Sequence, residues 1–438
     1  MSMQHEPPAQ APAPSVAIPI AILAALAIEV VFSVSRFAMP IEWLISERYW
    51  LVSTGVYASS ALLAMMGFAD LVRRLSDRQA MGARIAMIGH GVFLVLALCS
   101  GLVTMLGVTF GGEKMELVWT IQSYLYFATT FATTIGTIVA AGSFDRIAVP
   151  AVGMLVLSGM IAPPPFLGMT LHDLFGTSTR YVYPLFGVGQ LALQVVLVRF
   201  AARTSTRPLP TEPTAPFALL GAALRARVIA MFIVILFTLV AMGGRSIGAM
   251  KVALVGAPII NILAFVVFSV AALRATRGLT HGLQIAFTAA GAASTWCAGI
   301  LSMQTPAIYQ MLTQSADSYT SDRAIEMARA LPLVMPLVAT AAVVIALVAA
   351  GSYVRRIGHQ EVADSIGPRT TTFVILMATN VAVQIYAVPK VRSMGELFGL
   401  SIVSVIAGVA ALLVAANLFK RASDATSTTA LPTATALP

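Results

Sequence analysis

The chain carries little charge, and this scarcity excludes a water-soluble fold. Aspartate, glutamate, lysine and arginine make up 10% of its 438 residues, and hydrophobic residues make up 58%. Soluble domains have about 25% charged and about 45–50% apolar residues. The mean hydropathy is +0.88. One globular domain of this length cannot hide so much apolar surface from water, so the chain is predicted to lie in a membrane.

Cysteine and enzyme signatures are scarce as well. Cys99 and Cys297 are the only cysteines and both lie in apolar segments, which argues against a disulfide framework and favours small core residues. The chain contains no His-Glu-x-x-His, no Gly-x-Gly-Asp, no nucleophile elbow and no Walker loop. His90 is the only histidine in a predicted span, whereas a membrane haem protein needs several histidine ligands. We therefore expect neither an enzyme nor a cofactor.

Apolar runs of about 20 residues dominate the chain, and this is the length that an α-helix needs to cross a hydrocarbon core of about 30 Å. A membrane β-barrel would instead show alternating segments of about ten residues. The predicted fold class is an all-α polytopic membrane protein with about twelve transmembrane helices. The predicted spans are 16–35, 50–71, 85–108, 118–141, 147–168, 181–201, 227–244, 252–272, 283–303, 331–351, 371–388 and 397–418.

Two short segments occur twice in the chain. Residues 139–147 and 348–357 both read Val-Ala-Ala-Gly-Ser, then an aromatic residue, with arginine within the next two positions. Residues 84–91 and 284–291 share Ile-Ala and a final glycine. Because both pairs keep their order and similar spacing, we predict a duplicated unit. An even number of spans per unit predicts two six-helix halves with the same orientation, related by an axis along the membrane normal.

Charge and composition predict the domain limits and the orientation. Lysine and arginine are more frequent in the even-numbered loops, which predicts an inner-membrane protein with both termini in the cytoplasm. We interpret the net charge of +9 as this topology signal and not as a nucleic-acid footprint. The apolar end of the central linker is predicted to lie as an interfacial helix. The predicted parts are a disordered tail (1–15), a first bundle (16–201), a cytoplasmic linker (202–226), a second bundle (227–421) and a second disordered tail (422–438).

Glu29 is the clearest candidate for chemistry, because ionisable side chains at membrane depth are costly and usually functional or paired. It lies in the middle of the first predicted span. One interpretation is a carboxyl group that carries a proton, since burial favours its neutral form. The other is a structural group paired with Arg36, which lies on the same helical face about 10 Å away along the axis.

Other polar residues in the predicted spans have two interpretations each. His90 is either a proton relay or substrate contact, or a core histidine with its hydrogen bonds satisfied; the corresponding residue of the second copy is Ala290. Amide side chains either line a cavity or form interhelical hydrogen bonds. These amides are Gln122, Gln190, Gln194, Asn261, Asn380 and Gln384.

The first outer loop gives a weak enzymatic clue. It contains Glu42 and Glu47, and polytopic lipid-linked glycosyltransferases place acidic residues in this loop. Trp43 and Trp50 favour a simpler interpretation, an aromatic belt at the membrane interface.

The twelve spans, the parallel halves and the long central loop resemble the major facilitator superfamily. The family has a Gly-x-Leu-Ala-Asp-Arg-x-Gly-Arg-Arg-like loop between spans 2 and 3, and this chain has Leu75-Ser76-Asp77-Arg78 at that place. Arg73 replaces the leading glycine, and the second half lacks the aspartate. The resemblance implies alternating access by two rocking halves around a midplane site, with Asp77 and Arg78 in a gating loop.

These observations favour a secondary transporter of a small, largely apolar or amphipathic solute, coupled to protons through Glu29. Lysine and arginine are nearly absent from the predicted spans, which argues against anionic sugars or phosphates as substrates. The alternatives are a non-transporting membrane sensor or assembly partner and, less favoured, a lipid-handling enzyme. The expected partners are membrane lipid and an unidentified small molecule, without nucleic acid.

Overall fold

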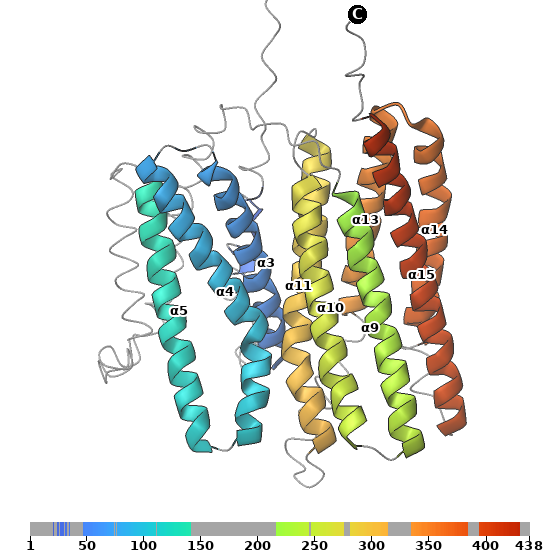
Figure 1. The fold of residues 1–438 in the computed structure, drawn as a ribbon, viewed down its shortest axis with the longest axis horizontal. Coiled ribbons are helices and arrows are strands. Elements are labelled where there is room, and N and C mark those ends of the chain that lie inside the picture. Colours follow the sequence, from blue (N-terminus) through green and yellow to red (C-terminus); the bar gives the residue numbers. More distant parts are fainter. Residues whose placement is uncertain are drawn as a thin grey trace, which may run out of the picture.

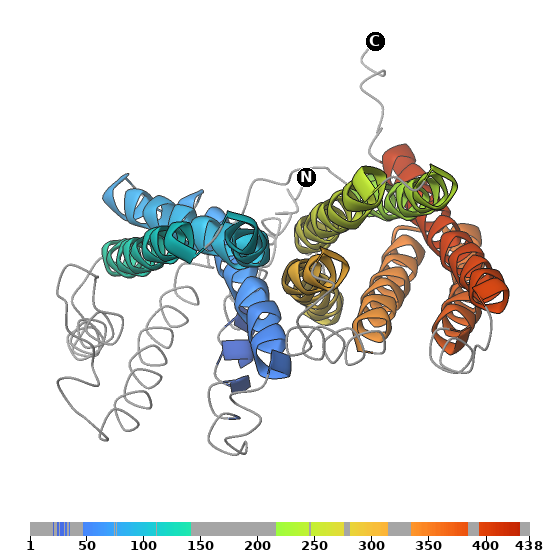
Figure 2. The same cartoon turned by 90° about the horizontal axis from the view of Figure 1, so that it is seen from below.

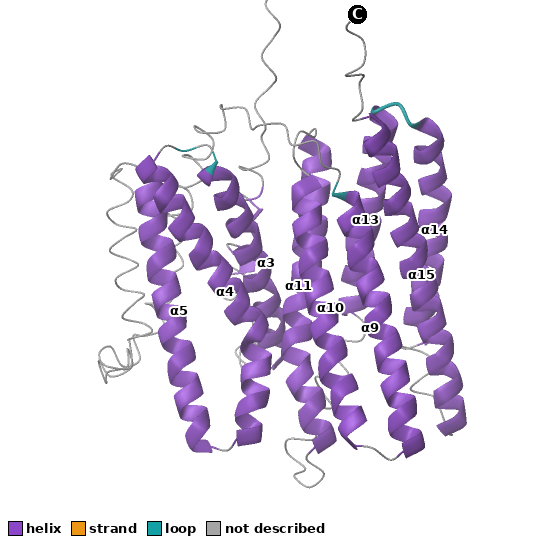
Figure 3. Cartoon of the chain, in the orientation of Figure 1, coloured by secondary structure: helices purple, strands orange, loops and turns teal. Residues whose placement is uncertain are grey.

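The computed structural model of the protein describes residues 47–73, 75, 77–110, 112–141, 216–244, 247–275, 281–313, 334–383 and 394–429. In the first predicted span it describes Ala21, Ala24, Ala25, Ala27, Ile28, Glu29, Val31, Phe32 and Ser35, all helical. Every regular element in these residues is a helix, with no strand among them (Figure 3). The prediction of a helical fold is confirmed.

The helices of the N-terminal part coincide with predicted spans 2–4. They are α3 (Glu47–Val72), α4 (Asp77–Phe110) and α5 (Gly112–Ala141). The helix α4 packs against both α3 and α5. Predicted spans 147–168 and 181–201 lie outside the described residues.

The helices of the C-terminal part coincide with predicted spans 7–12. They are α9 (Phe217–Gly244), α10 (Ile247–Ala275), α11 (His281–Thr313), α13 (Val334–Arg356), α14 (Gln360–Ala382) and α15 (Met394–Thr429). The chain reverses between α13 and α14 at Gly358, whose φ of +96° lies in the left-handed region that favours glycine. An exposed ion pair of 2.7 Å between Arg355 and Asp364 closes this turn.

Six described segments are long and apolar enough to cross a membrane. They are Val52–Val72, Arg78–Cys99, Gly256–Ala275, Gly282–Ser302, Val334–Arg356 and Ile402–Ser427. Their lengths of 20 to 26 residues match the span that a hydrocarbon core requires. By length and composition these six are candidate membrane-spanning helices, while the count of twelve and the two halves remain predictions.

Several helices extend beyond their predicted spans, for example α14, which begins at Gln360 instead of 371. Two of them, α9 and α15, extend into segments that the sequence predicted to be a linker and a tail. The sequence places an interfacial segment before residue 227, whereas α9 is one continuous helix from Phe217, with Phe217 and Leu224 buried in its first turns. The last helix continues to Thr429, into the region predicted as a disordered tail, and Ala422 and Ala425 are buried. Both helices thus continue past the apolar runs used to predict the spans, because neighbouring helices cover the apolar residues in these extensions.

The described helices stand side by side with similar directions, and α5 and α14 lie at opposite ends of the row (Figure 1). Seen from below, α3–α5 form one group and α9–α15 a second group (Figure 2). The helix α11 joins them, because it packs against α3 and α4 as well as α10 and α13. We call the contact of α11 with α3 and α4 the seam.

The two groups are packed by different means. The second group has a large core cluster that includes Phe217, Phe287, Phe373 and Phe419. In the first group, α4 and α5 cross at glycines: a Cβ atom added to Gly82 would lie 2.4 Å from the backbone nitrogen of Ala140. A Cβ atom on Gly136 would lie 2.5 Å from the nitrogen of Ala86. Such backbone contact through small residues is typical of helix association in lipid.

Candidate functional site

The carboxylate of Glu29 has a partner on the next helix. The hydroxyl group of Ser60, a buried residue of α3, donates a hydrogen bond to Glu29 Oε1. Ile28, next to Glu29, packs against a core cluster that includes Leu62 of α3 and Leu273 of α10. Arg36, the alternative partner predicted from the sequence, lies outside the described residues. Glu29 is therefore held against α3, in a region where the two groups of helices meet.

The neighbouring residue of α3 contacts the other group. Ser59 Oγ donates a hydrogen bond of 2.9 Å to the carbonyl oxygen of Ala292 in α11. Close to this bond, Gly55 and Gly299 bring the two backbones together, since a Cβ atom on Gly299 would lie 2.8 Å from the Cα atom of Gly55. Two consecutive serines of α3 thus have different partners. Ser60 bonds to Glu29, and Ser59 bonds to α11 across the seam.

The structure places two other candidates in contacts between helices. His90 stacks on Phe68 of α3, with ring centroids 5.5 Å apart and an interplanar angle of 22°. Asn380 is buried, and its Nδ2 atom donates a hydrogen bond of 2.6 Å to the carbonyl oxygen of Ser404 in α15. Both contacts match the structural interpretation of these residues.

The remaining candidates are dispersed. Gln122 lies in α5, and its buried Oε1 atom has no hydrogen-bond partner among the described residues. Asn261 lies in α10, one turn after Pro258. Because α5 and α14 lie at opposite ends of the row (Figure 1), Gln122 and Asn380 do not line a common cavity. Gln190, Gln194 and Gln384 lie outside the described residues.

The residues of the predicted gating loop and outer loop lie at helix ends. Asp77 is the first residue of α4, and Arg78 follows it with an exposed side chain. Glu47 is the first residue of α3, whereas Glu42 lies outside the described residues. Among the residues that the structure describes, no group of three histidine, cysteine, aspartate or glutamate side chains could hold a metal ion.

A residue that the sequence interpretation assigned to a loop lies deep inside the bundle. Arg227 was expected at the cytoplasmic end of span 7, yet it belongs to α9 and lines a pocket with Ser294 of α11 and Ala342 of α13. Ser294 lies about 20 Å along its helix from His281, at 1.5 Å per residue. Ala342 lies about 20 Å along its helix from Arg355, by the same rise. Ser294 and Ala342 also lie inside candidate membrane spans, and if these helices cross a bilayer Arg227 lies at the depth of its hydrocarbon core.

The guanidinium group of Arg227 is poorly compensated at this depth. Its Cζ atom lies 4.2 Å from the ring centroid of Phe265 in α10, a cation–π contact. Its Nε atom is buried without a hydrogen-bond partner, although part of the side chain remains accessible. No described carboxylate forms an ion pair with it. An uncompensated buried donor is costly, so Arg227 is the most unusual polar residue of the described bundle.

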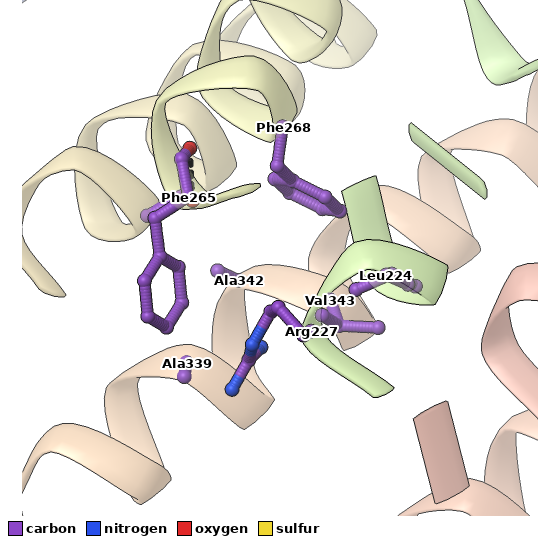
Figure 4. A pocket seen from close by; sticks show the side chains of 8 residues that line it. Leu224, Arg227, Phe265, Phe268, Ala339, Ala342 and Val343 are labelled. Carbon is purple, nitrogen blue, oxygen red and sulfur yellow. Dashed lines mark hydrogen bonds between the residues drawn. The ribbon is translucent and has the colours of Figure 1, made fainter. Parts of the chain in front are cut away.

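The pocket around Arg227 is small and almost entirely apolar. The guanidinium group projects between Phe265 and Ala339 (Figure 4). The Oγ atom of Ser294 is already bound to the Phe265 carbonyl oxygen, at 2.8 Å. The pocket offers room for about one water molecule in its enclosed part. Its lining consists of Leu224, Arg227, Phe265, Phe268, Ser294, Ala339, Ala342 and Val343.

One signal in the sequence could have identified Arg227. The apolar residues from Phe217 to Leu224 can supply two helical turns before the arginine, so a span that started at Phe217 would have placed Arg227 inside it. The positive-inside rule instead assigned the arginine to a cytoplasmic flank. Comparisons with protein-family models, curated proteins and solved structures found no match to this chain.

Proposed function

We propose that the protein is a secondary active transporter of the inner membrane that moves a small, amphipathic solute together with protons. In this proposal twelve helices form two parallel six-helix halves, with both termini in the cytoplasm. Glu29 carries the proton, and the seam between α11 and the pair α3 and α4 moves during alternating access. Asp77 and Arg78, at the start of α4, take part in gating, as the resemblance to the major facilitator superfamily implies.

The observation that carries this proposal is the pair of serines in α3. Ser60 donates to the Glu29 carboxylate, and Ser59 donates to Ala292 across the seam. A carboxylate only accepts hydrogen bonds, whereas a protonated carboxyl group also donates one. Protonation of Glu29 therefore weakens the bond from Ser60, because a neutral carboxyl group is a poorer acceptor than a carboxylate, and it does so one residue away from the contact between the groups. This arrangement couples the charge of Glu29 to the position of α3 on α11.

The seam is a close contact between two helix backbones. Gly55 and Gly299 allow this approach, and the side chain of Trp296 in α11 packs against Gly55. The repeated glycines support the duplication. A Cβ atom added to Gly91 would lie 3.3 Å from the sulfur atom of Met65 in α3, and one added to Gly291 would lie 3.2 Å from Leu273 in α10. Each repeated glycine thus faces the helix that precedes its own.

Proton-coupled flux in liposomes tests the proposal. The purified protein is reconstituted with the pH indicator pyranine trapped inside, and solutes are added singly from a panel of short monocarboxylates, amino acids and amphipathic amines. We expect one class to change the internal pH faster than in protein-free liposomes. Glu29→Gln should abolish the coupled pH change, because the amide cannot take up the proton.

The matched control is Glu361→Gln, at an exposed position in the first turn of α14. This variant should transport like the wild-type protein. The proposal is contradicted if no solute of the panel moves protons, or if Glu29→Gln moves them as fast as wild type.

A second candidate function, a non-transporting assembly partner, is favoured by the structural contacts of Asn380 and His90. In that case the polar residues only hold helices together. Glu29→Gln would then be tolerated, and a second membrane protein would co-purify in a fixed ratio with both wild type and variant.

A further inference from the structure

An arginine at membrane depth that lacks a counter-ion requires an explanation. Charged residues in spans are costly and usually line a pathway or pair with another charge. Arg227 lies in a pocket, its Nε atom has no hydrogen-bond partner, and no described carboxylate neutralises it. The contact with Phe265 covers one side of the guanidinium group but supplies no acceptor. Among the described residues, the guanidinium group thus has an aromatic contact but no counter-ion.

We propose that the pocket of Arg227 binds the carboxylate group of a small organic monoanion. This ligand class deepens the proposed function, because the anion would be the transported solute, and to that extent it rests on that proposal. The guanidinium group is a fork of N–H donors that matches a carboxylate, and the unpartnered Nε supplies one of them. The binding itself requires no transport.

The walls of the pocket define the rest of the ligand. Leu224, Phe268 and Val343 present apolar side chains around the single cation. Binding sites of this kind take an apolar body and orient it through a few polar groups. One guanidinium group balances one negative charge, which favours a monocarboxylate over a doubly charged phosphate. The enclosed part of the pocket has room for about one water molecule, which is enough for one carboxylate oxygen. The rest of the ligand would lie in the open part of the pocket, so the organic part must be short.

The depth of the site argues for a soluble ligand rather than a lipid headgroup. Headgroups lie at the edge of the hydrocarbon core, whereas Ser294 and Ala342 of the pocket lie about 20 Å from the polar helix ends. The sequence-based expectation against anionic sugars and phosphates placed Arg227 in a loop, so it did not count the one cation of this pocket.

Binding of propionate to the purified full-length protein in neutral detergent tests the proposal, with the neutral isostere propionamide as reference. Isothermal titration gives the dissociation constant, and thermal unfolding gives the midpoint temperature with and without ligand. We expect propionate to bind at least tenfold more tightly than propionamide and to raise the midpoint. A phosphatidylglycerol titration in the same detergent tests the lipid source.

Two substitutions separate the binding role from a structural one. Arg227→Gln should weaken propionate binding at least tenfold, yet unfold without ligand at the same temperature as wild type or higher, because it removes an uncompensated charge. Ala342→Leu keeps the arginine and fills the pocket, so it should also weaken binding at least tenfold. The control is Arg225→Gln, an exposed residue two positions away on α9, which should bind like wild type.

The proposal is overturned if propionamide binds as well as propionate, or if both pocket variants retain wild-type binding. It is also overturned if Arg227→Gln lowers the unfolding temperature while Ala342→Leu binds normally, since the arginine would then be structural, or if phosphatidylglycerol binds and propionate does not. Propionate binding without proton-coupled flux would support the site and contradict the transporter. Coupled flux of another solute, unchanged in Arg227→Gln, would support the transporter and contradict the site.

Discussion

Glu29 and Arg227 lie in two differently built regions, and the comparison shows where the structure leaves polar groups unsatisfied. Glu29 accepts a hydrogen bond from Ser60, next to a seam where glycine and serine bring α3 and α11 together. Arg227 stacks on Phe265 in a pocket of mostly apolar side chains, and its Nε atom has no hydrogen-bond partner among the described residues. In the two proposals, the first site exchanges a proton and the second binds an anion.

The predicted duplication relates the two sites. Glu29 lies in the first predicted span of the proposed first half, and Arg227 lies in α9, which corresponds to the first predicted span of the proposed second half. At the spacing of the repeated segments 84–91 and 284–291, the position that corresponds to Glu29 is Ile229, two residues after Arg227. The two halves would thus carry opposite charges at nearly the same depth, one suited to a proton and the other to an anion.

The largest expected effect concerns the seam next to Glu29. In Gly299→Ala the new Cβ atom would lie 2.8 Å from the Cα atom of Gly55, so the helices must separate. We expect the free energy of unfolding to fall by about 1–3 kcal/mol, the usual cost of overpacking. The measurement is reversible unfolding in mixed micelles. Gly256→Ala, a helical glycine with nothing within 4 Å of an added Cβ, is the control and should raise the stability by about 0.5–1 kcal/mol.

A smaller effect is expected from removal of the partner of Glu29. Ser60→Ala deletes the donor to the carboxylate and should lower the free energy of unfolding by about 1.5–2 kcal/mol, as for hydrogen bonds to charged groups. Ser352→Ala is the control, because the hydroxyl group of Ser352 is exposed and bonds only to Val348 of its own helix. Equal stability of the two variants would show that Ser60 does not hold Glu29.

The smallest effect concerns the only partner that the structure gives Arg227. Phe265→Leu removes apolar area and the cation–π contact, whereas Phe373→Leu removes similar area from an equally buried ring in α14 that has no ring contact among the described residues. Phe265→Leu should therefore be the more destabilising variant, by about 0.5–1 kcal/mol. A difference of zero or of opposite sign would mean that the ring does not stabilise the guanidinium group.

The helical class was predictable from the sequence, since runs of about 20 apolar residues have few alternatives. The candidate site was only partly predictable. Glu29 was found because a carboxylate inside an apolar run is conspicuous, but its partner Ser60 is an ordinary helix residue. Arg227 was missed because hydropathy alone does not tell an arginine near a helix end from one that extends deep into a bundle. The position of the arginine depends on how the neighbouring helices pack around it, and the local sequence does not determine these contacts.

The most direct test of the central claim measures whether proton binding at Glu29 is linked to anion binding at Arg227. Isothermal titration of propionate in buffers of different ionisation enthalpy gives the number of protons taken up with each ligand. Thermodynamic linkage requires coupled sites to affect each other reciprocally. The account predicts proton uptake by the wild-type protein and none by Glu29→Gln at unchanged binding stoichiometry. Equal proton uptake by both proteins, or none by either, would contradict it.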